Sequence, residues 1–177
     1  GQSPAAKMEK DGATTYLFAG DLDAALAYSS GNDGAVFTLL NDVTRTETLN
    51  IFISCTLDLG GRTIRNTGGG PGIYIGGLTD VTIQGKGEVI SEGGHALEAG
   101  VKTTLEGGTF TSRNGKLGVI LNVGKPHRKI IIAQYSVGVP LEGGQVVEGR
   151  GTLGFLFPLH RLDGGGAALT GGGDGGG

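Results

Sequence analysis

Apolar and polar residues alternate in a short phrase that recurs along the middle of the chain. Each copy is a strand-like triplet that ends on an aliphatic residue and is followed within two positions by glycine. The copies occupy residues 57–61, 81–85 and 103–107. Their third positions, Leu59, Ile83 and Leu105, lie 24 and then 22 residues apart. This near-constant spacing predicts a structural repeat of about that length.

A second phrase is interleaved with the first. It opens on Gly72, Gly94 and Gly118, whose spacings are 22 and then 24 residues. Two strand motifs with a common period predict a coiled β-solenoid, because each coil must reuse the same bends in order to stack on the previous coil. We therefore expect an all-β fold, a right-handed parallel β-helix.

The alternation within each phrase predicts which side chains face the interior. In residues 57–59 the two leucines would point inward and Asp58 outward, because successive strand residues face opposite sides of a sheet. Stacking would then align Leu59, Ile83 and Leu105 in an interior row with a spacing of about 4.8 Å. The same register would place Asp58 beside Thr82 and Thr104 on the outer surface.

The flanking segments predict five parts in the chain. Residues 1–13 are polar without periodicity and are expected to form a flexible arm. Residues 21–28 have a helical pattern in which Asp21 can cap free N–H groups, and such a helix would cover the open edge of the first coil. The predicted parts are an arm (1–13), a capping strand and helix (14–34), β-helix coils (35–124), an irregular segment or final coils (125–163) and a Gly-rich tail (164–177).

The repeat becomes irregular after residue 124. Residues 130–133 are expected to begin another strand. Residues 141–144 copy residues 105–108 letter for letter, yet they lie 36 residues further on. Either a coil carries an insertion near residues 125–129, or the similarity is accidental in a glycine-rich chain.

Composition narrows the classes of function. Glycine accounts for 38 of 177 residues, and the net charge is −3. Charges are scattered singly, so a nucleic-acid partner is not expected. No apolar run reaches the roughly 18 residues that a membrane-spanning helix needs. The first residues lack the pattern of a signal peptide, so none is expected within this chain. The single cysteine, Cys55, lies among strand-forming residues and is expected to be a small buried hydrophobe.

Residues 37–43, 49–51 and 57–64 resemble a known family. They are similar to the right-handed parallel β-helix (pectin-lyase-like) modules in large surface proteins of Gram-positive and gut bacteria. Such modules often open with a short helix like residues 21–28, and the resemblance covers about residues 14–123. Gly60 stands where the family usually has asparagine. The resemblance implies an extracellular, cell-surface or secreted module, often without catalytic activity.

Parallel β-helices also carry polysaccharide lyases and glycoside hydrolases, so an enzyme is an alternative. These enzymes need clustered carboxylates. The candidates here are Asp58, Glu92 and His95, and none forms a convincing cluster in the sequence. Gly94–His95–Ala96 only approximates the Gly-His-Gly motif of the hydrolases. We therefore predict no catalytic residue.

No cofactor is predicted. The histidines His95, His127 and His160 are isolated in the sequence, which disfavours a zinc site. Calcium at Asp21, Asp23 or Asp42 has no independent support, and helix capping explains the first two better. The basic cluster at residues 125–129 is best explained as a solvated loop.

Three functions remain open at this stage. The leading one is a non-enzymatic extracellular scaffold module, acting as a stalk, an adhesin or a glycan-contacting surface, whose partners are carbohydrate or other surface proteins. The second is a polysaccharide lyase or glycoside hydrolase. The third is a self-assembling fibre subunit that associates through the ends of the solenoid.

Overall fold

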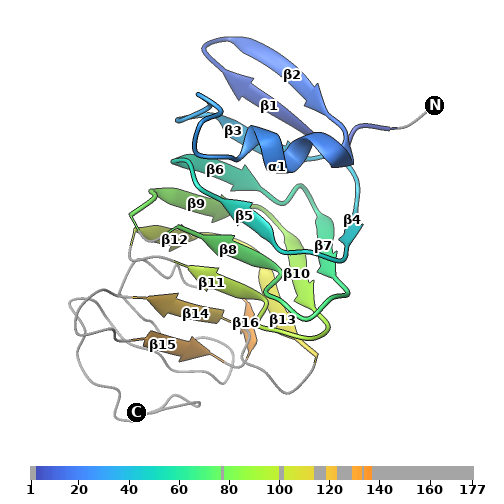
Figure 1. The fold of residues 1–177 in the computed structure, drawn as a ribbon, viewed down its shortest axis with the longest axis vertical. Coiled ribbons are helices and arrows are strands. Elements are labelled where there is room, and N and C mark those ends of the chain that lie inside the picture. The colour runs from blue at the N-terminus through green and yellow to red at the C-terminus, as the bar shows by residue number, and fades with distance from the viewer. Residues whose placement is uncertain are drawn as a thin grey trace.

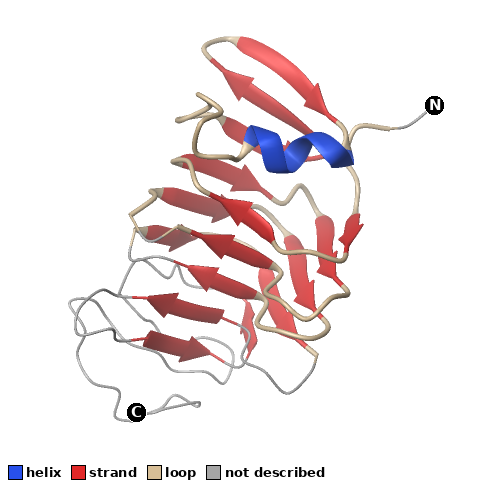
Figure 2. Ribbon diagram, viewed as in Figure 1, coloured by secondary structure: helices blue, strands red, loops and turns tan. Residues whose placement is uncertain are grey.

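A computed structural model describes residues 3–76, 78–99, 102–113, 119–122, 129–132 and 134–136. Their strands form three sheets (Figures 1 and 2). Sheet A contains β1 (Ala6–Lys10), β2 (Ala13–Leu17), β3 (Val36–Leu39), β6 (Cys55–Asp58), β9 (Val81–Gln84) and β12 (Thr103–Leu105). Sheet B contains β4 (Val43–Arg45), β7 (Arg62–Asn66), β10 (Gly87–Ser91), β13 (Thr109–Ser112) and β16 (Gln134–Ser136). Sheet C contains β5 (Leu49–Ile51), β8 (Ile73–Ile75), β11 (Leu97–Ala99), β14 (Val119–Asn122) and β15 (Lys129–Ile132).

The chain visits the three sheets in turn, which makes a coil. The first coil is β3–β4–β5, and the next three begin at β6, β9 and β12. Strands of successive coils pair in parallel in every sheet. The predicted β-solenoid is therefore confirmed, and Figure 1 shows its coils stacked below the N-terminal hairpin.

The interior of sheet A is a row of apolar side chains in exact register. Phe37 pairs with Leu57, Leu57 with Ile83, and Ile83 with Leu105. All four are at most 2% exposed. Leu59, which the spacing placed opposite Ile83, instead follows β6, and its amide donates to the carbonyl of Gln84. The predicted register is thus confirmed for Ile83 and Leu105 and wrong by two residues for Leu59. Leu59 is nevertheless buried, because a two-residue shift keeps a side chain on the same face.

The outer row of sheet A changes accordingly. Thr56, Thr82 and Thr104 form one row. Asp58 pairs with Gln84, whose Nε2 donates to the Asp58 carboxylate at 3.1 Å. The prediction that Asp58 lies beside Thr82 and Thr104 is therefore wrong.

The second phrase shows a similar shift in sheet C. Leu97 pairs with both Ile73 and Val119. Gly72 consequently lies beside Ala96 and not beside Gly94, and its amide donates to the carbonyl of His95. Spacing alone did not fix these partners because glycine recurs at several neighbouring positions.

The first coil is covered by two elements. Residues 6–10, which were expected to belong to a flexible arm, form β1, which pairs antiparallel with β3 and with β2. The missed signal is the alternation of Ala6 and Met8 with charged residues. This hairpin covers the edge of sheet A that would otherwise expose unpaired backbone groups.

The predicted helix is present but shorter. A 3₁₀ turn (Ala19–Asp21) leads into α1 (Leu22–Ala25), which buries Leu22 and Ala25 and contacts β5. Asp21 precedes α1, yet its carboxylate accepts a hydrogen bond from the amide of Phe18 and caps no α1 N–H group. Asp23 binds Arg45 at 2.8 Å, which ties the helix to β4.

A row of polar side chains, two of them fully buried, lies where sheet B turns toward sheet C. Asn66, Ser91 and Ser112 are in register. The Asn66 amide donates to the Pro71 carbonyl at 2.7 Å, and Ser91 Oγ donates to the Gly70 carbonyl at 2.8 Å. Side chains therefore satisfy turn carbonyls that would otherwise lack partners.

Among the described strands, β14 is the last that pairs in parallel with the preceding coil. Strand β15 pairs antiparallel with β14, and β16 pairs antiparallel with β13. The expected strand near residues 130–133 is present as β15. The copied phrase at residues 141–144, His127, His160 and the Gly-rich tail lie outside the described residues.

A charge in the interior row should break the stack. Ile83 is fully buried between Leu57 and Leu105. We expect Ile83→Asp to abolish cooperative folding, because an unpaired charge in an apolar interior costs several kcal/mol. Ile83→Val, the matched control, should cost only about 0.5–1.5 kcal/mol. Urea unfolding followed by circular dichroism measures both, and similar losses for the two variants would contradict the register.

Two adjacent glycines between β6 and β7 provide a second test of how closely the coils stack. Gly60 and Gly61 both have positive φ, 60° and 78°. An added Cβ at Gly60 would overlap the Leu39 carbonyl oxygen of the previous coil, whereas one at Gly61 would meet nothing within 4 Å. Gly61→Ala should therefore cost about 1–2 kcal/mol from backbone strain alone, and Gly60→Ala clearly more. Equal costs in urea unfolding would show that the coils are not stacked closely at this corner.

Candidate binding groove

A continuous alternation from residue 49 to residue 59 builds the floor of a surface groove. Every odd-numbered residue of this stretch is buried, and every even-numbered one is partly or fully exposed. Phe52 is thereby placed outward, with 42% of its surface exposed. The outward positions in order are Asn50, Phe52, Ser54, Thr56 and Asp58, of which the first four line the groove.

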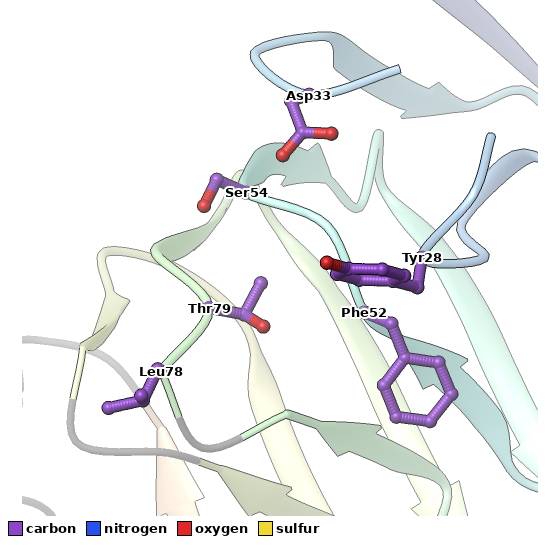
Figure 3. Close-up of a pocket in the computed structure, with 6 residues that line it drawn as sticks. All are labelled: Tyr28, Asp33, Phe52, Ser54, Leu78 and Thr79. Atoms are coloured by element: carbon purple, nitrogen blue, oxygen red, sulfur yellow. The ribbon is translucent and has the colours of Figure 1, made fainter. Parts of the chain in front are cut away.

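The walls come from distant parts of the chain. Tyr28, which follows α1, is 85% exposed, and Leu78, between β8 and β9, is 80% exposed. Together with Asp33, Phe52, Ser54 and Thr79 they line a hollow of about 440 Å³. Figure 3 shows the side chains of Tyr28 and Phe52 on the right of the view, with Asp33 and Ser54 above Thr79.

The Phe52 ring contacts the ring of Tyr74, on β8 of the next coil. Its centroid lies 6.1 Å from that of Tyr74, with the ring planes at 63°, an edge-to-face contact. Such pairs contribute about 0.5–1.5 kcal/mol beyond their buried area. Phe52 therefore presents a fixed aromatic surface to solvent.

Two further hollows adjoin this one. The first shares Phe52 and extends along β5 toward α1, with lining residues Asp23, Ala27, Glu47, Thr48 and Asn50. The other shares Ser54 and extends to the start of β9, with lining residues Gly34, Cys55, Thr56, Asp80 and Thr82. We call the three hollows together the corner groove. It follows the outward residues of the floor, which suits an extended ligand.

The corner groove is acidic. Asp23, Asp33, Glu47 and Asp80 line it, and its described lining includes no Lys, Arg or His. Asp23 is neutralised by Arg45. In the described part of the chain the carboxylates of Asp33, Glu47 and Asp80 form no salt bridge.

The site candidates from the sequence lie elsewhere. Asp58 accepts hydrogen bonds from the Gly60 amide and from Gln84, so its carboxylate orders the corner after β6. Glu92 pairs with Arg65 and lies 3.9 Å from Arg113. His95 is half-buried in the turn between β10 and β11. Within the described ranges, no three His, Cys, Asp or Glu residues are placed to hold a metal ion.

The sequence signal for the groove was partial. Phe52 breaks the polar pattern of the outward positions, so its exposure could have been inferred from the alternation. That Tyr28, Asp33 and Leu78 come together could not have been inferred, because their positions depend on where the capping helix ends and on the register of β8 and β9.

Comparisons of the chain with protein-family models, with curated proteins and with solved structures find no match. The described residues include no helix that is long and apolar enough to cross a membrane.

Cys55 is buried, as expected, with 6% of its surface exposed. Burial raises the pKa of its thiol to about 12, and the carboxylate of Asp33 contributes to the increase. A thiol that holds its proton at neutral pH is a poor nucleophile and a poor metal ligand.

The raised pKa predicts a loss of stability in alkali. Below the unfolded-state pKa, near 9, the thiol is protonated in both states and the free energy of unfolding does not depend on it. Above that pH only the unfolded state loses the proton, so stability should fall by up to about 1.4 kcal/mol per pH unit. Urea unfolding between pH 8 and 10.5 should show a steeper decline for the native chain than for Cys55→Ala. Parallel declines would contradict the assignment.

Proposed function

We propose that this chain is a non-enzymatic extracellular scaffold module that contacts glycans through the corner groove. The observation that carries the proposal is the pair of exposed rings, Tyr28 and Phe52, in a hollow that also contains one carboxylate and hydroxyl groups. Sugar rings combine apolar C–H faces with a polar rim. Aromatic faces complement the former, and Asp33, Ser54 and Thr79 complement the latter.

The exposure of these side chains supports a binding role. Five large apolar side chains are exposed in the described residues, and three of them, Tyr28, Phe52 and Leu78, line one hollow. Contiguous exposed apolar surface with a polar rim is characteristic of interaction sites, whereas apolar residues scattered singly are ordinary.

The resemblance to pectin-lyase-like modules of bacterial surface proteins supports the extracellular setting. The phrases that carry it, at residues 37–43 and 57–64, build the first two coils of the solenoid. The short helix ahead of the coils, α1, is also part of that pattern.

An enzyme on the same scaffold is the second candidate. Asp33 and Asp80 line adjoining hollows that share Ser54, and glycoside hydrolases use two carboxylates. Both side chains are exposed, however. Burial in an apolar site is a principal means of keeping a catalytic carboxylic acid protonated near neutral pH. The geometry therefore favours binding over hydrolysis.

Self-assembly through the ends of the solenoid receives less support at the N-terminal end. The β1–β2 hairpin covers the first coil in sheet A, and α1 packs against β5 in sheet C. The edges of β3 and β5 are therefore occupied, although β2 becomes the outer strand of sheet A. Light scattering across a range of protein concentrations tests this alternative, which requires a mass that increases with concentration.

A glycan panel tests the proposed function. We expect the native chain to bind at least one class of oligosaccharide without releasing reducing ends. Tyr28→Ala should weaken binding by about fivefold, since loss of the apolar contact between one ring and a sugar face is worth about 1 kcal/mol. Tyr16→Ala is the matched control, because Tyr16 is 59% exposed but lies on β2, outside the lining of the groove.

Two outcomes would overturn this proposal. Measurable cleavage of any polysaccharide would assign the chain to the enzymes. Equal losses for Tyr28→Ala and Tyr16→Ala would place the glycan contact outside the corner groove.

A further inference from the structure

The negative charges of the corner groove bear on which class of glycan would fit it. Three carboxylates, those of Asp33, Glu47 and Asp80, line it without a salt bridge in the described residues. The whole chain carries a net charge of only −3. The described lining therefore carries negative charge and no cation, and a concave surface of one sign focuses its field on the ligand.

The basic side chains nearest the groove are already engaged, since the Lys10 ammonium group donates to the Gly31 carbonyl. Arg65 and Arg113 flank Glu92 beside sheet B, and Arg45, which lies near the groove, is engaged by Asp23 and by the carbonyl oxygen of Glu47. The groove thus lacks the guanidinium groups that recognise carboxylates and sulfates in bidentate fashion. An acidic polysaccharide would meet repulsion here.

The aromatic rings of the groove favour a positively charged ligand. A cation over the face of a tyrosine or phenylalanine ring is attracted by the ring quadrupole. Tyr28 and Phe52 lie in the same hollow as Asp33, whose carboxylate is above the Tyr28 ring in the view of Figure 3. Asp80 lies beyond Ser54, in the adjoining hollow. Rings and carboxylates together can receive a ligand that is both ring-shaped and positively charged.

We propose that the corner groove binds glycans that carry free amino groups, as in polymers of deacetylated amino sugars. This inference rests on the proposed glycan contact and adds its chemical class. The sugar ring stacks on Phe52 and Tyr28, and the ammonium groups lie against Asp33 and Asp80. An N-acetylated glycan retains the stacking but has no positive charge. A uronate polymer carries negative charge, which the carboxylates of the groove would repel.

Calorimetry with the full chain and three oligosaccharides of matched length tests the inference: glucosamine, N-acetylglucosamine and galacturonate oligomers. At low ionic strength and pH 6 the glucosamine oligomer should bind at least about fivefold more tightly than its N-acetylated counterpart. Added salt should reduce the difference. Galacturonate should bind most weakly.

Variants assign the effect to particular side chains. Asp33→Asn and Asp80→Asn should each weaken binding of the glucosamine oligomer by about two- to fivefold and leave the N-acetylated oligomer unaffected. Asp11→Asn is the matched control, since Asp11 lies in the β1–β2 turn with a positive φ of 52° that asparagine tolerates.

The outcomes separate the inference from the function on which it rests. Equal binding of the glucosamine and N-acetylated oligomers, or tightest binding of galacturonate, overturns the charge selectivity and leaves glycan contact intact. Failure of all three to bind, together with a negative wider panel, overturns both. Equally tight binding of an oligolysine with the same number of charges would identify a basic peptide as the ligand and overturn the amino-sugar assignment.

Discussion

The register between successive coils is the constraint on which the rest of the structure depends. A single coil cannot bury its own apolar side chains, so each coil is stable only when stacked on a neighbour. The row of Phe37, Leu57, Ile83 and Leu105 shows how this is achieved. Burial of each such side chain is worth about 1.5–3 kcal/mol, and the parallel backbone hydrogen bonds fix which side chain meets which.

The groove follows from the same register. Burial of Ile51, Ile53 and Cys55 on one face requires the residues between them to point outward. Phe52 is therefore exposed because its neighbours are buried. The turn from β5 to β6 then brings this outward row beside the end of the capping helix and the β8–β9 connection, which supply Tyr28 and Leu78. A structural necessity of the solenoid thus generates a surface suited to ligands.

The sequence predicted the faces of the strands better than their partners. Alternation identified the inward residues, including Leu59 and Ile83, because a period of two is insensitive to a two-residue shift. The same insensitivity explains the wrong partner for Ile83. Strand β1 was missed because the charged residues Lys7, Glu9 and Lys10 obscure its alternation. The strand itself pairs with β3 and covers that edge of the first coil. The groove was missed because it joins residues that only the three-dimensional register brings together.

The register of β6 and β9 tests the central claim most directly. Amide-to-amide and Hα-to-amide nuclear Overhauser effects in isotopically labelled protein report which residues of two parallel strands face each other. The account predicts cross-strand contacts that pair Leu57 with Ile83 and Thr56 with Thr82. Contacts that pair Leu59 with Ile83 would contradict it, and with it the arrangement of the coil stack from which the groove is derived.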